Sequence, residues 1–110
     1  MRLPTTGLTP ADLRVMRGIA QAFDAIALGA GMRQYEPGRL RSVPYYCADR
    51  YTRACAALSL AFGYLDWQVI GDNLMAATMR ICNVLATITF GTSDIHPYTH
   101  WVRLDMEKAT

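Results

Sequence analysis

Asp66–Phe90, DWQVIGDNLMAATMRICNVLATITF, is the longest segment of the chain with a periodic apolar pattern. Apolar side chains recur in it every three or four residues, which is the spacing of one face of an α-helix. This stripe contains Ile70, Leu74, Ala77, Ile81, Leu85 and Ile88. A second stripe beside it contains Met75, Met79, Cys82 and Ala86. The pattern predicts one long helix, roughly Trp67–Phe90, that needs covering around most of its circumference.

Two shorter helices are expected before this segment. Thr9 and Asp12 have the spacing of a capping box around Pro10, so a helix is predicted over Pro10–Leu28, with the glycines that follow ending it. A second helix is predicted over Pro44–Phe62, with Ser42 as its cap. The weak alternation of residues 39–43 also fits a short strand before it.

The fold class predicted from these patterns is all-α, a small three- to four-helix bundle. One domain spans residues 1–110, with residues 1–8 as a loose N-terminal arm. The tail, residues 98–110, has an apolar alternation that fits a strand and a wider spacing that fits a short helix, so its structure stays open.

Composition narrows the class of protein. The formal net charge of +2 is too small to indicate nucleic-acid binding by itself. Cys47, Cys55 and Cys82 form no C-x-x-C pair and fall on apolar faces of the expected helices, so we expect buried, reduced thiols and a cytoplasmic protein. Charged and amide side chains within residues 66–90 make a membrane-spanning helix too costly, and the N-terminal residues contain no apolar run typical of a signal peptide.

Residues with catalytic or metal-binding chemistry are sparse. His96 and His100 are spaced as two ligands on one helix face, but a metal site needs three or four ligands and only Asp94 stands near them. No serine has a G-x-S-x-G context and no glycine-rich phosphate motif occurs. We therefore expect no catalytic residue, no metal and no cofactor, and keep a small metal-dependent enzyme that uses both histidines as a second alternative.

The most distinctive charge pattern lies in residues 33–53, where five arginines and four tyrosines are opposed by only two acidic residues. The candidate partner-binding residues are Arg33, Tyr35, Arg39, Arg41, Tyr45, Tyr46, Arg50 and Arg53. Arginine and tyrosine are enriched in the hot spots of protein interfaces, and arginine with aromatic rings also binds nucleic acids. The remaining interpretation is a solvated loop and helix face.

The two shorter helices can cover only part of the long helix, so we expect the methionine stripe of the long helix to stay exposed in a single chain. This predicts a homodimer with Met75, Met79 and Cys82 in its interface. The function we expect is that of a small cytoplasmic regulator or inhibitor that binds another protein without catalysis. By analogy, such chains occur among bacterial and mobile-element accessory proteins of the anti-defence or anti-activator type. A nucleic-acid-binding helical module that uses residues 33–53 is the first alternative.

Overall fold

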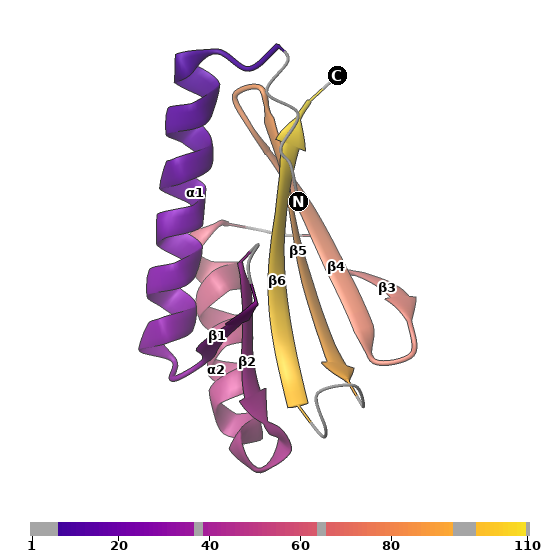
Figure 1. Ribbon diagram of the computed structural model, residues 1–110. Helices are drawn as coiled ribbons and strands as arrows, with labels where there is room; N and C mark the ends of the chain where they lie inside the picture. Colours follow the sequence, from indigo (N-terminus) through magenta and orange to yellow (C-terminus); the bar gives the residue numbers. More distant parts are fainter. Residues whose placement is uncertain (1–6, 37–38, 64–65, 94–98, 110) are drawn as a thin grey trace.

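The computed structural model describes residues 7–36, 39–63, 66–93 and 99–109. Within these residues it has two layers, a six-stranded antiparallel sheet and two helices that cover one face of it (Figure 1). The helices are α1 (Pro10–Gly29) and α2 (Ala48–Ala61), with a short 3₁₀ helix, η1 (Tyr45–Cys47), directly before α2. The strands are β1 (Arg33–Glu36), β2 (Leu40–Pro44), β3 (Gln68–Gly71), β4 (Leu74–Ile81), β5 (Val84–Ser93) and β6 (Thr99–Lys108). Their order across the sheet is β1-β2-β6-β5-β4-β3.

The all-α prediction, a three- to four-helix bundle, is wrong, because residues 66–90 form strands instead of one long helix. Two-residue turns interrupt the segment at Asp72–Asn73 and at Cys82–Asn83. Asn73 and Cys82 have φ angles of 56° and 54°, in the left-handed region that a right-handed helix excludes. The chain reverses direction at each turn, and each strand then begins its own alternation of buried and exposed side chains. The apparent helical spacing appears only when residues are counted straight through both turns as if the segment were continuous.

The alternation of buried side chains confirms the strands. Along β5, every second side chain enters the core, from Val84 to Phe90, as the two-residue period of a strand requires. Val102 and Leu104 on β6 are paired with β5 residues of the same face and are buried in the same way. Of the two structures considered for the tail, the strand is therefore confirmed and the short helix is wrong.

The helical stripe expected to form a dimer interface does not exist as a helix face. Met75 and Met79 lie on β4 and share the face of the sheet that carries the helices, and Cys82 lies in the following turn. Met79 packs against the core, whereas the Met75 side chain is 40% exposed. Cys82 is also exposed, so the expectation that all three thiols lie on buried helical faces is wrong for it.

The first predicted helix is confirmed. The Thr9 hydroxyl accepts a hydrogen bond from the Asp12 backbone N–H at 3.1 Å, and the Asp12 carboxylate accepts one from the Thr9 backbone N–H at 3.0 Å. The hydrogen bond from the Thr9 backbone holds the pKa of Asp12 below its usual value. The second predicted helix begins later than expected, at Ala48, and Ser42 is part of β2 instead of its cap.

The core lies between the helices and the middle of the sheet. Phe23 of α1 and Leu58 of α2 are fully buried against it. The helices contact mainly β1, β2, β5 and β6, so β3 and much of β4 extend beyond the helical layer (Figure 1). Within the described part of the chain, neither helix has the length and apolar character needed to cross a membrane.

The turn at Cys82 provides a test that separates the hairpin from a helix. Glycine takes a positive φ without the steric cost that a Cβ atom adds, so Cys82→Gly should raise the free energy of unfolding by about 1 kcal/mol. In a continuous helix the same change would lower it by about 1 kcal/mol. Chemical denaturation measures the sign. Ala56→Gly, at an exposed position inside α2, is the matched control and should destabilise the protein; a loss of stability in Cys82→Gly would contradict the hairpin.

Candidate functional site

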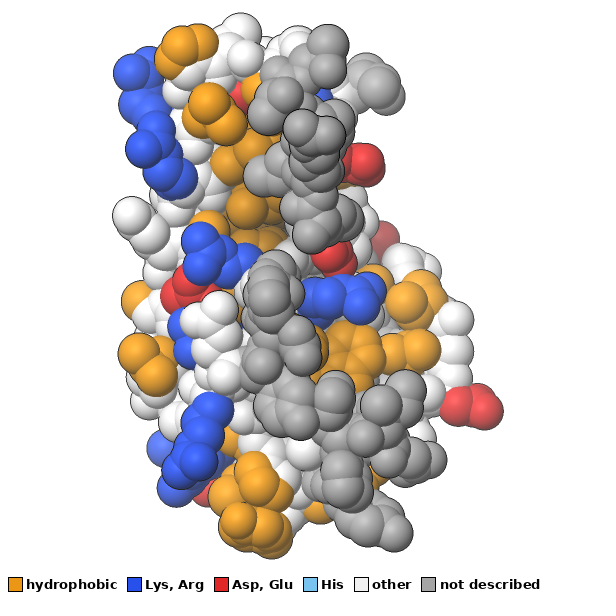
Figure 2. All heavy atoms as spheres, viewed as in Figure 1, with side chains coloured by type: hydrophobic (Ala, Val, Ile, Leu, Met, Phe, Trp, Pro, Cys, Tyr) orange, Lys and Arg blue, Asp and Glu red, His pale blue; other side chains and the backbone are white. Residues whose placement is uncertain are grey.

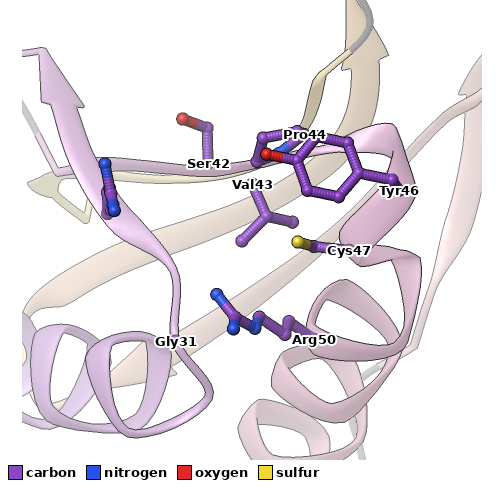
Figure 3. A pocket seen from close by; sticks show the side chains of 8 residues that line it. Gly31, Ser42, Val43, Pro44, Tyr46, Cys47 and Arg50 are labelled. Atoms are coloured by element: carbon purple, nitrogen blue, oxygen red, sulfur yellow. The ribbon is translucent and has the colours of Figure 1, made fainter.

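A recess opens between the β1–β2 hairpin, the end of α1 and the start of α2 (Figure 3). Its volume is about 240 Å³, which suits a single side chain or a small anion better than a dinucleotide-sized cofactor. The lining residues are Gly31, Arg33, Ser42, Val43, Pro44, Tyr46, Cys47 and Arg50. Three of the predicted partner-binding residues, Arg33, Tyr46 and Arg50, therefore lie around one recess.

Gly31 shapes the path of the Arg50 side chain. It follows α1 with a φ of +88°, a conformation that glycine adopts without strain and that reverses the chain toward β1. A Cβ atom at this position would lie 2.9 Å from Cδ and 3.2 Å from Nε of Arg50. The positive φ is what favours glycine here, and a Cβ atom would in addition displace the exposed Arg50 side chain.

The side chains of the recess converge from two elements. Val43, Cys47 and Arg50 point into the space between the hairpin and α2, whereas the Ser42 hydroxyl lies on the opposite side of β2 (Figure 3). No side-chain hydrogen bond caps the start of α2 at Cys47. The positive end of the helix dipole and the charge of Arg50 both favour an anion here, and Asp49 in the same turn opposes it.

Two other arginines of the predicted site have a structural role. Asp24 of α1 accepts an ion pair from Arg39 at 2.9 Å and another from Arg41 at 3.2 Å. Arg41 is only 8% exposed, so removing its carboxylate partner would leave a buried charge unpaired. These contacts hold β2 against α1. They also neutralise the charges of Arg39 and Arg41, which the sequence analysis had counted as available for a partner.

The remaining arginines divide into one paired and two without an acidic partner. Arg53 contacts Asp49 at 3.1 Å, one helical turn away, and both side chains are exposed. Such surface pairs contribute only about 0.3–0.5 kcal/mol. Among the side chains that the structure describes, Arg33 and Arg50 have no carboxylate within ion-pair distance. Of the five arginines in this segment, two are therefore uncompensated by any described side chain, and both line the recess.

The tyrosines also separate by role. The rings of Tyr45 and Tyr51 each lie 4.6 Å from the His100 imidazole, the first edge-on and the second stacked, so they fix η1 and α2 against β6. Burial raises the pKa of the Tyr51 phenol, and it raises that of the neighbouring Cys55 thiol to about 12. Tyr46, by contrast, is 87% exposed at the rim of the recess.

The histidine pair considered for a metal does not have the expected geometry. His100 lies on β6 instead of a helix, with its Nδ1 atom buried and without a hydrogen-bond partner. His96 lies outside the described residues, as does the side chain of Tyr35. In the described ranges, no three His, Cys, Asp or Glu side chains gather closely enough to hold one ion.

Sequence reasoning missed three residues of the recess. Val43 and Cys47 were expected in or before a helix face, and Gly31 was expected only to end a helix. The alternation at residues 39–43 fitted a short strand, which the structure has as β2, but the sequence did not show that Val43 faces the recess. The contact between Gly31 and Arg50 could not be predicted from the sequence, because the two residues are distant along the chain and come close only in the folded protein.

Comparison with protein-family models, with curated protein sequences and with solved structures finds no match to this chain. Its function has to be argued from its own residues.

The buried imidazole predicts a pH dependence. Burial lowers the pKa of His100 from its ordinary value of 6.5, so below that pH the unfolded chain binds a proton more readily than the folded protein does. The stability due to neutral His100 is fully present above about pH 6.5 and is lost as the pH falls toward the lowered pKa. Thermal unfolding measured between neutral and mildly acidic pH should show this loss. His100→Phe keeps an aromatic ring and should flatten the profile; equal slopes in both proteins would contradict the assignment.

Proposed function

We propose that this protein is a non-catalytic binding module, a small regulator or inhibitor, that receives an acidic side chain of a partner protein in the recess. The observation that carries the proposal is the pair Arg33 and Arg50, which line a recess of about 240 Å³ and have no acidic partner among the described side chains. Guanidinium groups bind carboxylates through two parallel hydrogen bonds, which gives geometric specificity as well as attraction.

The surroundings of the recess suit a protein interface. Tyr46 exposes most of its ring at the rim, beside the apolar Val43 and Pro44. Tyrosine and arginine dominate interface hot spots, because a large rigid ring excludes water around a charged contact and strengthens it. An acidic side chain that entered the recess would therefore be partly desolvated and held from both sides.

A nucleic acid is a weaker candidate. Binding to a phosphate backbone uses several basic side chains along one surface. Here Arg39 and Arg41 are occupied by Asp24, and Arg53 is paired with Asp49. On the face shown in Figure 2, the basic side chains form separate groups divided by hydrophobic, polar and acidic ones.

An enzymatic role has less support from this site. The described lining contains one thiol, Cys47, and two hydroxyl groups, but no histidine or carboxylate that could act as a general base. Binding without chemistry is the use that the side chains around the recess support.

The test compares three forms of the protein as bait in extracts of its source cells, each with and without nuclease treatment. Arg33→Gln/Arg50→Gln should lose a partner that the wild type captures. Arg17→Gln, which removes an exposed charge on α1, is the matched control and should retain it. With the purified partner, loss of one charged hydrogen-bonded contact should weaken binding roughly tenfold to a hundredfold.

Two results would contradict the proposal. Equal capture by all three forms would show that the recess is not the binding site. Capture that disappears after nuclease treatment, with an affinity for duplex DNA that falls steeply with salt, would assign the arginines to a nucleic acid.

A further inference from the structure

The His100 imidazole has a buried polar atom that the fold leaves unsatisfied. Its Nδ1 atom lies out of water without a hydrogen-bond partner, and among the residues that the structure describes it is the one buried side-chain nitrogen or oxygen in this state. Such an atom costs stability, so folded proteins keep few of them, and each one calls for an explanation. The binding role proposed above makes no use of this imidazole.

The imidazole is enclosed by aromatic rings from the two elements that follow β2. The Tyr45 ring of η1 meets it edge-on, with 4.6 Å between the ring centroids. The Tyr51 ring of α2 stacks on it at the same distance, with 17° between the ring planes. On the sheet, His100 is the register partner of Val43 on β2 and of Thr92 on β5. Through these rings, η1 and the first turn of α2 lie against β6.

The same segment forms a wall of the recess. Val43, Pro44, Tyr46 and Cys47 line the recess, and they stand directly before and after Tyr45 in the sequence (Figure 3). None of the three residues of η1 is buried, so contacts at its sides, such as this ring pair, have to hold it in place. The shape of the recess therefore depends on the rings around the imidazole.

Among the described residues, the groups around the imidazole supply no free negative charge to hold a proton on it. The phenols of Tyr45 and Tyr51 face it, and the Cys55 thiol lies next to Tyr51. Burial raises the pKa of Tyr51, and that of Cys55 to about 12, so both stay neutral near about pH 7. Cys47 points into the recess (Figure 3), and the charged side chains at the start of α2 are exposed. On α1, Asp24 is already held by two arginines of β2.

We infer that His100 is a pH-sensitive switch of the recess. The neutral imidazole stays between the two tyrosine rings and holds η1 and the start of α2 on β6, which is the closed form. Both nitrogens of a protonated imidazole carry a hydrogen, so the buried Nδ1–H group then has a charge and no described acceptor. The ring moves toward water, η1 leaves β6 with it, and the recess opens. The β5–β6 ladder stays folded, because local opening costs less than global unfolding.

Linkage sets the direction of the switch. In the closed form burial lowers the pKa of His100 from its ordinary value of 6.5, and a ring that reaches water regains that value. The closed form is therefore favoured above about pH 6.5 and is lost as the pH falls toward the lowered pKa. Each unit by which burial lowers the pKa shifts the balance between the two forms about tenfold. Binding of an acidic partner is lost with the closed form, a consequence that rests on the proposed function.

Nuclear magnetic resonance of the whole chain, titrated from about pH 7.5 to about pH 4.5, tests the switch. The ring signals of His100 should report a pKa below 6.5. The backbone amides of Tyr46, Cys47 and Arg50 should shift or broaden with the same midpoint. Amides of the central ladder, such as that of Ile88, should stay unchanged, as should the far-UV circular dichroism.

Two variants separate the switch from other effects of pH. His96→Gln removes the other histidine of the chain and is the matched control, which should keep the transition of the recess amides. His100→Phe keeps an aromatic ring and should abolish that transition. Arg33→Gln/Arg50→Gln should keep it, so failure of the recess as a binding site and failure of the switch give different results.

Three results would overturn the inference. A pKa of His100 at or above 6.5 in the wild type would show that the stacked Tyr51 ring holds the imidazolium in place, as a cation over an aromatic face can be held. Recess amides that do not follow the His100 titration would show that the ring does not control the recess. An equal transition in His100→Phe would assign it to another group.

Discussion

The antiparallel ladder between β5 and β6 is the interaction on which the rest of the structure depends. It joins ten residue pairs, from Val84–Lys108 to Ser93–Thr99, and lies at the centre of the sheet. Because side chains alternate along both strands, the ladder gathers their apolar side chains on one face, where the helices bury them. The other strands add outward from it, with β4 and β3 beyond β5 and with β2 and β1 beyond β6.

The recess is a consequence of that arrangement. β2 pairs with β6, although about half of the chain separates them in sequence, and Arg41 of β2 reaches Asp24 of α1. These contacts hold the β1–β2 hairpin beside the end of α1. The Tyr45, Tyr51 and His100 rings hold the start of α2 against β6. The walls around Arg50 are thus fixed by three elements that meet only in the folded protein.

Charge is sorted by the same contacts. Asp24 neutralises two arginines and Asp49 neutralises a third, so Arg33 and Arg50 are the arginines of residues 33–53 that have no ion pair with a described carboxylate.

Local chemistry alone determined the start of α1. The capping box of Thr9 and Asp12 acts within four residues, so its signal is complete in the sequence. The short strand before α2 and the strand in the tail were also visible as alternations. The concentration of arginine and tyrosine in residues 33–53 coincides with part of the lining of the recess, but the sequence could not show which arginines are already paired.

Tertiary structure decided the strands of residues 66–90 and the membership of the recess. Apolar residues at a spacing of three or four satisfy a helix and also a pair of hairpins, and the two are separated only by whether neighbouring strands are present to complete the backbone hydrogen bonds. β5 pairs with β6, which comes from the C-terminal part of the chain. This pairing outweighs the helical spacing of the apolar residues in residues 66–90. The partners of Arg41 and the contact between Gly31 and Arg50 likewise join residues distant in sequence, because a side chain meets its neighbours in space and the sequence records only its neighbours along the chain.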